Sequence, residues 1–456
     1  MLLETPRTFR DRPININDQG QRNWIHAKQP KGKWYVRRTV VAWIAIAFLV
    51  FAPFIKINGN PLMLFDVANR RFSIFGQLIW AQDSYLLALI MTITVVFIVL
   101  FTVVFGRLWC GWTCPQTVFL EMVYRRIEYF FEGNYRTGKP QKEMTTKLFF
   151  LKLAKHATFI LVSIFITNIF LNWIIGPEKL WAIITEPIHN HLFGFVAMIA
   201  LSLFYYWIFA FFREQVCTMI CPYGRLQGVL LDSKSIAVIY DYKRGEPRGA
   251  KAKGDCIDCH QCVSVCPTGI DIKNGSQLEC INCTACIDEC NIVMKKINKP
   301  ENLIRFDSVQ GIETGNSSIF NARTYAYSAV LGVLLIVLAV TLANRKPIET
   351  SMLRVSGSIY QKVDSVTYSN IYLLKIINKT LVDKSLQIKF MEPKRGKIQL
   401  ATGQTLLKSQ GILESVMIAN IQTKDLKGES TPIQIGIYEG EELLGVYTTN
   451  FLGPAN

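Results

Sequence analysis

The chain has 456 residues, half of them hydrophobic, and its mean hydropathy is +0.24. This composition excludes an ordinary soluble protein of this length and predicts membrane-spanning segments. The formal net charge is +16. Because the basic residues flank apolar runs, we expect them to contact anionic membrane lipid, and we expect no nucleic-acid partner.

The first 38 residues carry nine Lys and Arg before any apolar run begins. This pattern differs from a cleavable signal peptide. We therefore predict that residues 1–38 form a basic tail and that the first apolar run is a retained membrane helix.

Five apolar runs are long enough to cross a bilayer, since about 20 helical residues span its hydrocarbon layer of about 30 Å. None of the five contains a charged residue, which disfavours the alternative of buried helices in a soluble core. We predict a polytopic α-helical membrane protein with five transmembrane helices, four of them within a membrane domain at 39–212. The predicted spans are 39–55, 84–105, 157–175, 192–212 and 324–343.

The orientation of these spans follows from the Lys and Arg counts of the connections. Nine such residues precede the first span, and three, nine and one lie in the next three connections. Because basic loops stay in the cytoplasm, the N-terminus and residues 213–323 are predicted to be cytoplasmic. Residues 350–456 would then lie in the periplasm, and the protein would be a multi-pass protein of the inner (plasma) membrane.

All twelve cysteines lie between Cys110 and Cys290, and none falls in the predicted periplasmic tail. Structural disulfides are expected in an oxidising compartment, so this distribution favours metal or redox chemistry on the cytoplasmic side.

Eight cysteines form two consecutive C-x2-C-x2-C-x3-C motifs in the predicted cytoplasmic segment. This spacing is typical of an inserted bacterial-type ferredoxin domain with two [4Fe-4S] clusters, in which each motif supplies three ligands and the other motif supplies the fourth. Zinc is the alternative, which the doubled pattern with Pro267 disfavours. We predict one cluster bound by Cys256, Cys259, Cys262 and Cys290, and a second bound by Cys280, Cys283, Cys286 and Cys266.

The second motif is followed by Asn291 rather than proline, which removes a turn-forming residue but does not argue against ligation. Five carboxylates stand near the clusters and would tend to lower their reduction potentials. These are Asp255, Asp258, Asp271, Asp288 and Glu289.

The other four cysteines form two C-x3-C-P motifs, each directly after a predicted span. Proline after the second cysteine predicts that Cys114 and Cys221 are N-caps of interfacial helices. We expect a lowered thiol pKa there, and, if each span stays helical through its motif, two sulfurs on one face. The alternative is that these four cysteines have no chemical role and are simply small, buried, hydrophobic side chains. The repeat favours a catalytic metal or redox site formed by Cys110, Cys114, Cys217 and Cys221, which would bind copper or a further cluster.

After the last span, short alternating runs separated by turn residues predict a β-sandwich of roughly 100 residues. The predicted strands lie at 370–377, 386–391, 397–401, 413–421 and 432–438. With no cysteine and no cluster of catalytic groups, the domain is interpreted as a docking or stabilising module.

The five spans, both C-x3-C-P motifs, the double ferredoxin motif and the terminal β-domain closely resemble the CcoG family, also called FixG or RdxA. The resemblance covers nearly the whole chain and implies an immunoglobulin-like C-terminal domain. It further implies a cupric reductase that supplies Cu(I) for the copper centre of a cbb-type cytochrome oxidase. The implied partners are that oxidase or its copper chaperones, together with an unidentified electron donor.

Two other functions stay open at this point. A quinol-linked electron relay similar to the NapH family would combine the same membrane motifs with a ferredoxin segment. An assembly scaffold without catalysis would use the clusters only for structure or sensing.

Overall fold

A computed structural model describes residues 21–454, apart from 58, 68–70, 80–82, 134–145, 276, 317–320, 346, 356–358, 381, 394, 402, 404–405 and 410. The first 20 residues of the predicted basic tail therefore lie outside the described residues. The chain divides into two compact units, Met1–Leu338 and Ala339–Asn456.

Five helices in the described part of the chain are long and apolar enough to cross a membrane, as the sequence predicts. The first helix starts six residues before its predicted span and includes Arg37 and Arg38. Most of the residues in these helices are not buried by other parts of the protein, as expected for helices whose other solvent is lipid. The five are α1 Lys33–Phe51, α2 Ser84–Phe105, α6 Thr146–Ile175, α8 Leu192–Trp207 with its π-helical extension η4 Ile208–Phe212, and α14 Ala322–Ala343.

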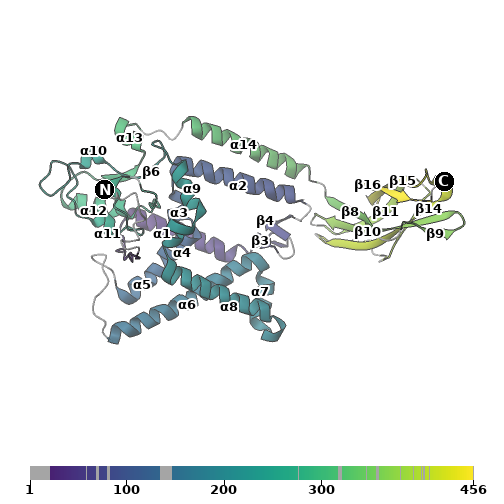
Figure 1. The fold of residues 1–456 in the computed structure, drawn as a ribbon, viewed down its shortest axis with the longest axis horizontal. Coiled ribbons are helices and arrows are strands. Elements are labelled where there is room, and N and C mark those ends of the chain that lie inside the picture. The colour runs from purple at the N-terminus through teal and green to yellow at the C-terminus, as the bar shows by residue number, and fades with distance from the viewer. Residues whose placement is uncertain are drawn as a thin grey trace, which may run out of the picture. The chain divides into compact units, whose positions relative to one another are not determined.

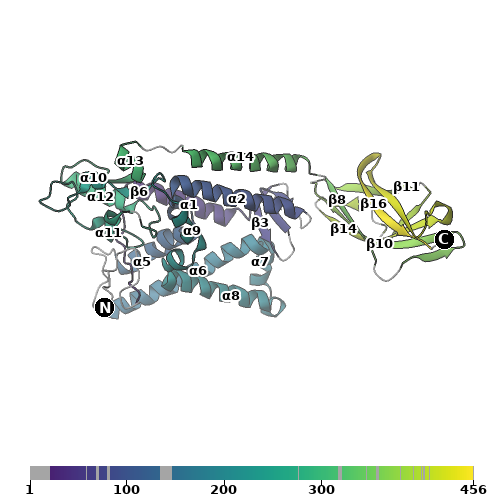
Figure 2. The same ribbon diagram turned by 45° about the horizontal axis from the view of Figure 1, so that its top comes forward.

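The membrane helices pack through an aromatic core that an interfacial segment completes. Helices α6 and α8 lie side by side (Figures 1 and 2). The interfacial segment contributes Tyr124, whose ring stacks on Phe209 of η4 at 4.6 Å and meets Phe159 of α6 edge-on at 4.8 Å. The Tyr124 hydroxyl lies 2.7 Å from Ser163 Oγ, so its polar group has a partner within the core. The segment comprises α4 Pro115–Phe119, the π-helical turn η2 Leu120–Tyr124 and α5 Arg125–Glu132.

Two connections at the other end of the membrane helices contain structure that the sequence did not predict. Between α1 and α2, three short antiparallel strands form a small sheet in the order β3-β4-β5, beside a two-stranded ribbon of β1 and β2. Helices α6 and α8 are joined by α7 and a single 3₁₀ turn. The bounds are β1 Lys56–Ile57, β2 Asn60–Pro61, β3 Met63–Asp66, β4 Arg71–Ile74, β5 Gln77–Ile79, α7 Pro177–Thr185 and η3 Ile188–Asn190.

The cysteine-rich segment is framed by one antiparallel strand pair, β6 with β7, in which Val238 pairs with Phe306. Its core contains Val238, Ile272, Ile287 and Leu303, all nearly inaccessible to solvent. The elements are β6 Ala237–Tyr240, α10 Tyr242–Gly245, α11 Gln261–Ser264, η6 Ile272–Asn274, α12 Ala285–Lys296, β7 Ile304–Asp307 and α13 Val309–Thr314.

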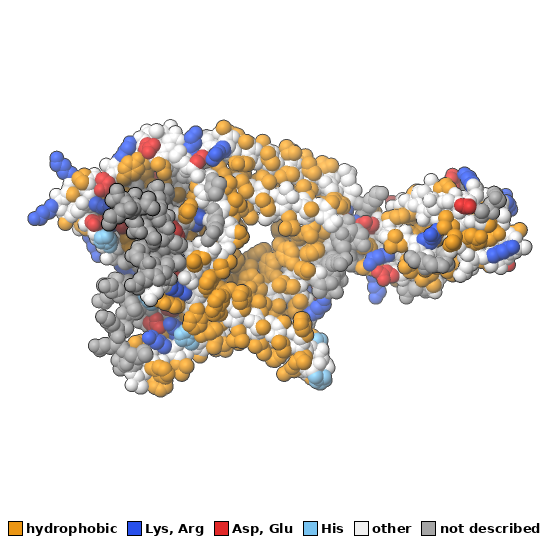
Figure 3. Space-filling view, viewed as in Figure 1, with side chains coloured by type: hydrophobic (Ala, Val, Ile, Leu, Met, Phe, Trp, Pro, Cys, Tyr) orange, Lys and Arg blue, Asp and Glu red, His pale blue; other side chains and the backbone are white. Residues whose placement is uncertain are grey.

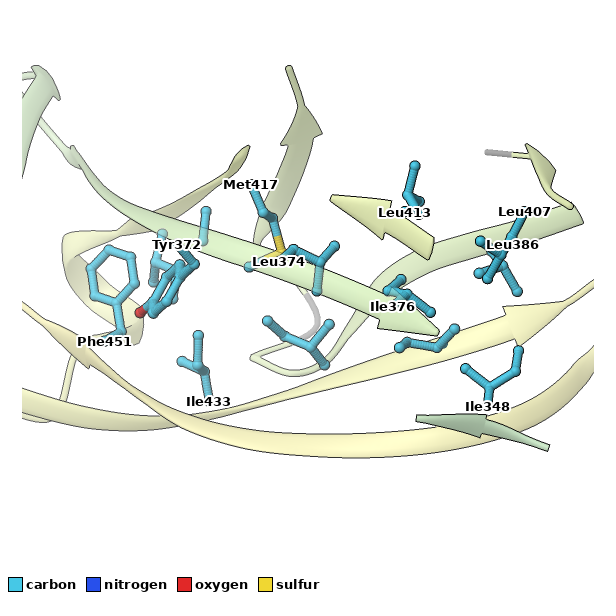
Figure 4. Close-up of a cluster of buried hydrophobic side chains, with 14 residues drawn as sticks. Ile348, Tyr372, Leu374, Ile376, Leu386, Leu407, Leu413, Met417, Ile433 and Phe451 are labelled. Atoms are coloured by element: carbon cyan, nitrogen blue, oxygen red, sulfur yellow. The ribbon is translucent and has the colours of Figure 1, made fainter. Parts of the chain in front are cut away.

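The second unit is a β-sandwich. One sheet has the order β12-β14-β10-β8, with β9 also paired to β10, and the other has the order β13-β11-β15-β16. Alternate residues of facing strands, such as Tyr372 and Leu374 of β10 and Ile433 of β15, fill the space between the sheets (Figure 4). The five predicted strands are present, each longer or shorter by a few residues. The bounds are β8 Ile348–Arg354, β9 Gln361–Asp364, β10 Thr367–Asn378, β11 Lys384–Glu392, β12 Lys397–Leu400, β13 Leu406–Leu407, β14 Ile412–Gln422, β15 Ser430–Glu439 and β16 Glu442–Leu452, with one 3₁₀ turn, η7 Thr423–Asp425.

Candidate metal centres

The two ferredoxin motifs fold into loops with the same backbone shape. Asp258 and Asn282, two residues after the first cysteine of each motif, have φ of 56° and 52°. His260 and Thr284, two residues further on, have φ of 54° and 66°. Asn and Asp adopt this left-handed region more readily than most residues. The repeated pair of left-handed residues curls each loop tightly around its three leading cysteines.

A first hollow is lined by the thiols of Cys256, Cys259 and Cys262, together with Cys290 from α12. Its remaining walls include the apolar side chains of Leu303 and Ile304. Three thiols therefore come from the first motif and the fourth comes from the second motif.

A second hollow is lined by Cys280, Cys283 and Cys286 of the second motif and by Cys266 of the first motif. Cys262 also reaches this hollow, so the two spaces are neighbours. Four thiols around an apolar space suit a [4Fe-4S] cluster, and the grouping is the one that exchange of the fourth cysteine predicts.

The residue after the last cysteine distinguishes the two motifs. Pro267 follows the end of α11, whereas Asn291 lies inside α12, which continues to Lys296. The Asn291 side chain accepts a hydrogen bond of 2.8 Å from the backbone N–H of Asn302. Asparagine instead of proline thus lets α12 extend past Cys290 and bind the following segment.

The carboxylates near the hollows are all partnered, so the local negative charge is smaller than the sequence suggests. Lys273 contacts both Asp258 and Asp271, at 2.5 and 3.5 Å. Asp288 accepts hydrogen bonds from the first turn of α1, which helps to explain why this helix starts before its predicted span. The other two pairs are Asp255 with Arg244 at 2.7 Å and Glu289 with Lys28 at 3.1 Å.

The two C-x3-C-P motifs also share a backbone shape, but neither continues the preceding membrane helix. Gly106 and Arg213, four residues before the first cysteine of each motif, have φ of 57° and 51° and interrupt the helices. The condition for two sulfurs on one helix face, a span that stays helical through its motif, is therefore not met. Helix α3 Leu108–Trp112 and the π-helical turn η5 Val216–Ile220 follow the two breaks.

The second cysteine of each motif is an N-cap, as predicted. Cys114 precedes α4, and Cys221 precedes α9 Pro222–Leu230, each with proline as the first helical residue. The backbone N–H of Cys114 bonds Trp109 O at 3.0 Å, and that of Cys221 bonds Val216 O at 2.8 Å. Both bonds reach back five residues, so the two motifs are structural repeats as well as sequence repeats.

Hydrogen bonds between the motifs bring their four thiols together. The Arg107 guanidinium donates to the carbonyl of Gly224, and the Cys110 thiol donates to Gln227 Oε1 at 3.4 Å. In the other direction, Gln116 Nε2 donates to the carbonyl of Arg213 at 3.5 Å. Each motif thereby holds the segment that carries the other. Cys110, Cys114, Cys217 and Cys221 lie near enough for their charges to interact, and we name them the membrane-face thiols.

Burial raises the pKa of three of these thiols, Cys110, Cys114 and Cys217. Desolvation, and then repulsion from Cys114, raises the pKa of Cys110 to about 12, while Arg107 acts to lower it. Desolvation, and then repulsion from Cys114 and Cys110, raises the pKa of Cys217 to about 12. The pKa of Cys114 is also raised, chiefly by burial, although backbone N–H groups of the helix that it caps act against the shift. The prediction of a lowered pKa is therefore wrong for Cys114, because loss of hydration outweighs the helix terminus.

The membrane-face thiols lie against the loop of the second hollow. A Cβ atom added to Gly111, between Cys110 and Cys114, would stand 2.2 Å from Ile281 O and 3.2 Å from Cys283 N. The Trp112 indole donates a 3.2 Å hydrogen bond to the carbonyl of Asn282. Cys110 itself packs on the small cluster that contains Cys283. The three groups of thiols therefore follow one another in space: the first hollow, then the second hollow, then the membrane-face thiols.

Comparison with known proteins matches each part of this arrangement. A 4Fe-4S dicluster domain profile matches residues 212–252 and 246–309, and a 4Fe-4S binding domain profile matches residues 87–136, which include Cys110 and Cys114. The profile for the Ig-like fold at the C-terminus of FixG matches residues 338–454.

Two Cereibacter sphaeroides proteins are similar over most of their length. RdxB is 30% identical over 81% of this chain and 82% of its own, and RdxA is 28% identical over 80% of this chain and 81% of its own. The nitrogen fixation protein FixG of Rhizobium meliloti is 32% identical over 63% of this chain and 57% of its own. The chain belongs to the FixG/RdxA family. It is a membrane iron–sulfur electron-transfer protein.

A more distant relative shares only part of this FixG/RdxA architecture. The ferredoxin-type protein NapH of Escherichia coli is 22% identical over 57% of this chain and 87% of its own length.

Two buried arginines of this FixG/RdxA chain stand beside the thiols. Arg107 is 6% exposed and acts to lower the pKa of both Cys110 and Cys280, so it lies between the membrane-face thiols and the second hollow. Arg38 is 2% exposed, bonds Gly111 O at 2.7 Å, and acts to lower the pKa of Cys283. Arg107 Nε and Arg38 Nη2 are buried without a hydrogen-bond partner among the described residues. Unused N–H donors beside soft thiols fit anionic clusters at these places.

Sequence reasoning missed Gly111, Arg38 and Arg107. The signal available for Gly111 was a glycine between two candidate ligands, where close backbone approach is a common cause. The signal for the arginines was weaker, because both belong to basic stretches that we assigned to membrane orientation.

Proposed function

We propose that this chain is a cupric reductase, in which electrons delivered to the ferredoxin segment reduce Cu(II) to Cu(I) at the membrane-face thiols. The observation that supports the proposal is the backbone contact of Gly111 with Ile281 and Cys283. This contact supports electron transfer from the second thiol group to a copper site at these thiols, and thiolates favour the Cu(I) product. The Cu(I) would assist assembly of the copper centre of a cbb-type cytochrome oxidase, with that oxidase or its chaperones as recipient.

The clusters are assigned to the thiols that share each hollow. Cys256, Cys259, Cys262 and Cys290 would hold the first cluster, and Cys266, Cys280, Cys283 and Cys286 the second. When bound, each cluster supplies one-electron transfer. The protein contributes the apolar walls that limit water, and Arg38 and Arg107 place positive charge beside the second group.

The membrane-face thiols have two possible occupants, copper as substrate or a further cluster. Among the described residues, no three Cys, His, Asp or Glu side chains lie close enough to hold one metal ion. Cubane thiolates each bind a different iron atom, and the 4Fe-4S binding domain profile includes Cys110 and Cys114. These observations support the further cluster, with Cu(II) reduced at its edge.

The proposed orientation keeps the ferredoxin segment in the cytoplasm and the β-sandwich in the periplasm. The start of α1 contacts Asp288 of the ferredoxin segment, and Gly111 of α3, after α2, contacts Ile281 of the same segment. These two parts, which are also the connections richest in Lys and Arg, thus lie on one side of the membrane.

The assay that tests the function combines metal quantification with anaerobic Cu(II) reduction, detected by a Cu(I) chelator. About eight irons per chain would mean two clusters, and about twelve would add a third. We expect the variant with alanine at all four membrane-face positions to keep about eight irons and lose Cu(II) reduction. Unchanged Cu(II) reduction by that variant would contradict the assignment of these thiols as the site of Cu(II) reduction.

A quinol-linked relay similar to NapH is the second candidate, favoured by one cavity. This cavity of about 450 Å³ lies beside Cys280 and is lined by Leu231, Asp232, Ser235 and Leu278 among others. Its lining is divided about equally between apolar side chains, which could hold a quinol ring, and polar side chains such as Asp232 and Glu279, which could bond its oxygens. This candidate predicts that menaquinol reduces the clusters without copper, and failure of that reduction would count against it.

A further inference from the structure

We infer that the first hollow marks a docking surface for a soluble, acidic one-electron carrier protein. The surface consists of Cys259, His260 and the basic loop that carries Lys243, Arg248, Lys251 and Lys253. The inference rests on the proposed function, because it names the kind of donor that would feed the same thiol groups.

The first observation is exposure. Among the eight cysteines of the two hollows, Cys259 is the one that is exposed, whereas Cys283 and Cys266 of the second hollow are buried. The neighbouring His260 side chain is 63% exposed. The first hollow therefore reaches the protein surface at Cys259, where a partner could approach its contents closely.

The second observation is the charge beside this opening. Residues 243–253 contain five Lys and Arg and one acidic residue, Glu246. The loop is fixed to the first motif, because the Gly249 N–H bonds Cys256 O at 2.8 Å and Arg248 acts on the pKa of Asp258.

The acidic side chains of this region already have internal cationic partners. Lys273 is paired with Asp258 and Asp271, and Arg244 is paired with Asp255. Lys251 and Lys253 are exposed and form no ion pair with any described residue. Their positive charge is therefore available to an external partner.

The position of the loop separates it from the membrane. Within the first unit, α10 and the loop after it lie at the end opposite to β3 and β4, with the membrane helices between them (Figures 1 and 2). Figure 3 shows basic side chains projecting from this end, whereas apolar side chains cover the helices. Lipid headgroups are thus a poor match for Lys251 and Lys253, and a soluble partner fits better.

The chemistry of the partner follows from these features. A carrier with acidic residues around its cofactor would be steered to the basic loop, and such steering raises association rates by about 10 to 1,000-fold. Each encounter would oxidise the carrier by one electron and reduce this chain by one electron. No proton or group is transferred.

The test measures reduction of the full-length protein by a reduced flavodoxin in stopped flow. The variant Lys251→Glu/Lys253→Glu reverses the free charges without touching a thiol or an ion pair. A matched control, Lys397→Glu/Lys424→Glu, makes the same change of net charge at exposed positions of the β-sandwich. Ionic strength is varied from about 0.01 M to about 1 M, over which the Debye length falls from about 30 Å to about 3 Å.

We expect the second-order rate constant to fall at least about tenfold in the loop variant at low ionic strength, and by less than about twofold in the control. The wild-type advantage should vanish at high ionic strength. Equal rates in the wild type and the loop variant would overturn the inference. Loss of binding to anionic vesicles with unchanged reduction would also overturn it, because the loop would then be a lipid contact.

Reduced methyl viologen, a small carrier that needs no docking surface, separates this failure from failure of the proposed function. If methyl viologen reduces the clusters and Cu(II) is reduced, but the loop variant behaves as wild type, only the docking surface is wrong. If the protein contains no clusters, the proposed function itself fails.

Discussion

The two ferredoxin hollows have the same thiol spacing and the same pair of left-handed residues, but they occupy different surroundings. The first opens to solvent at Cys259 and is bordered by a basic loop. The second is enclosed by the membrane domain, with Gly111 against its loop and Arg38 and Arg107 buried beside it. The same local structure thus presents one hollow at the surface, where we propose that an electron donor docks, and one hollow in the interior, beside the membrane-face thiols.

The largest expected effect comes from removing Cys266 or Cys290, each of which completes the hollow of the other motif. Cys266→Ala alters the first motif but should remove the second cluster, so that iron falls by about four per chain. Cu(II) reduction should stop while a soluble donor still reduces the remaining cluster. Cys290→Ala is the matched variant and should remove the first cluster. Electron paramagnetic resonance spectra show which cluster each variant keeps. Identical spectra from the two variants would contradict the assignment of the two clusters to separate hollows.

The residue after the last cysteine offers the next largest effect. Asn291→Pro would remove a helix-interior N–H from α12, at a cost of about 3 kcal/mol. Asn291→Ala should cost only about 1 kcal/mol, from loss of the bond to Asn302 N. Thermal unfolding followed by cluster absorbance measures both. A proline variant as stable as the alanine variant would show that α12 does not depend on this difference between the motifs.

The close approach at Gly111 can be tested by adding one methyl group. Gly111→Ala would place a Cβ atom 2.2 Å from Ile281 O, and such overpacking costs typically about 1–3 kcal/mol. We expect lower thermal stability and slower Cu(II) reduction, with the first hollow unaffected. Gly332→Ala in α14 is the control, because nothing lies within 4 Å of its added Cβ. A normal rate of Cu(II) reduction in the Gly111 variant would show that electron transfer does not depend on this contact.

The buried charge of Arg107 should give the smallest effect. Arg107→Gln removes a positive charge near Cys280 and Cys110, and we expect the reduction potential of the second cluster to fall. An interaction of about 1–2 kcal/mol corresponds to a shift on the order of 50–90 mV for one electron. Arg107→Lys keeps the charge and should shift the potential less. Redox titration measures the cluster potentials of both variants. A shift confined to the first cluster would contradict the position of Arg107 beside the second hollow.

Local patterns in the sequence predicted the helices, the grouping of the eight ferredoxin cysteines and most strands of the β-sandwich. Hydropathy and ligand spacing depend on residues that are close in the sequence, so they can be recognised without knowledge of the fold. The helix breaks at Gly106 and Arg213 were missed, because apolar periodicity does not register a single residue with positive φ. The strands at 56–79 were also missed, since two to four residues carry too little alternation to detect.

The properties that depend on distant segments could not be predicted. The pKa of Cys110 is set by burial among segments that lie far apart in the sequence, which outweighs the nearby charge of Arg107. Glu289 and Asp258 near the clusters pair with Lys28 and Lys273, partners that no spacing rule identifies. Close backbone approach at Gly111 likewise joins residues about 170 positions apart in the chain.

Single-turnover reoxidation tests most directly the claim that the membrane-face thiols accept electrons from the ferredoxin segment. The protein is reduced anaerobically, freed of excess reductant, and mixed with Cu(II), while cluster absorbance is followed. We predict that Cu(II) rapidly reoxidises the wild-type clusters. In the variant with alanine at Cys110, Cys114, Cys217 and Cys221, both clusters should be present and stay reduced. Reoxidation at the same rate in that variant would contradict the account.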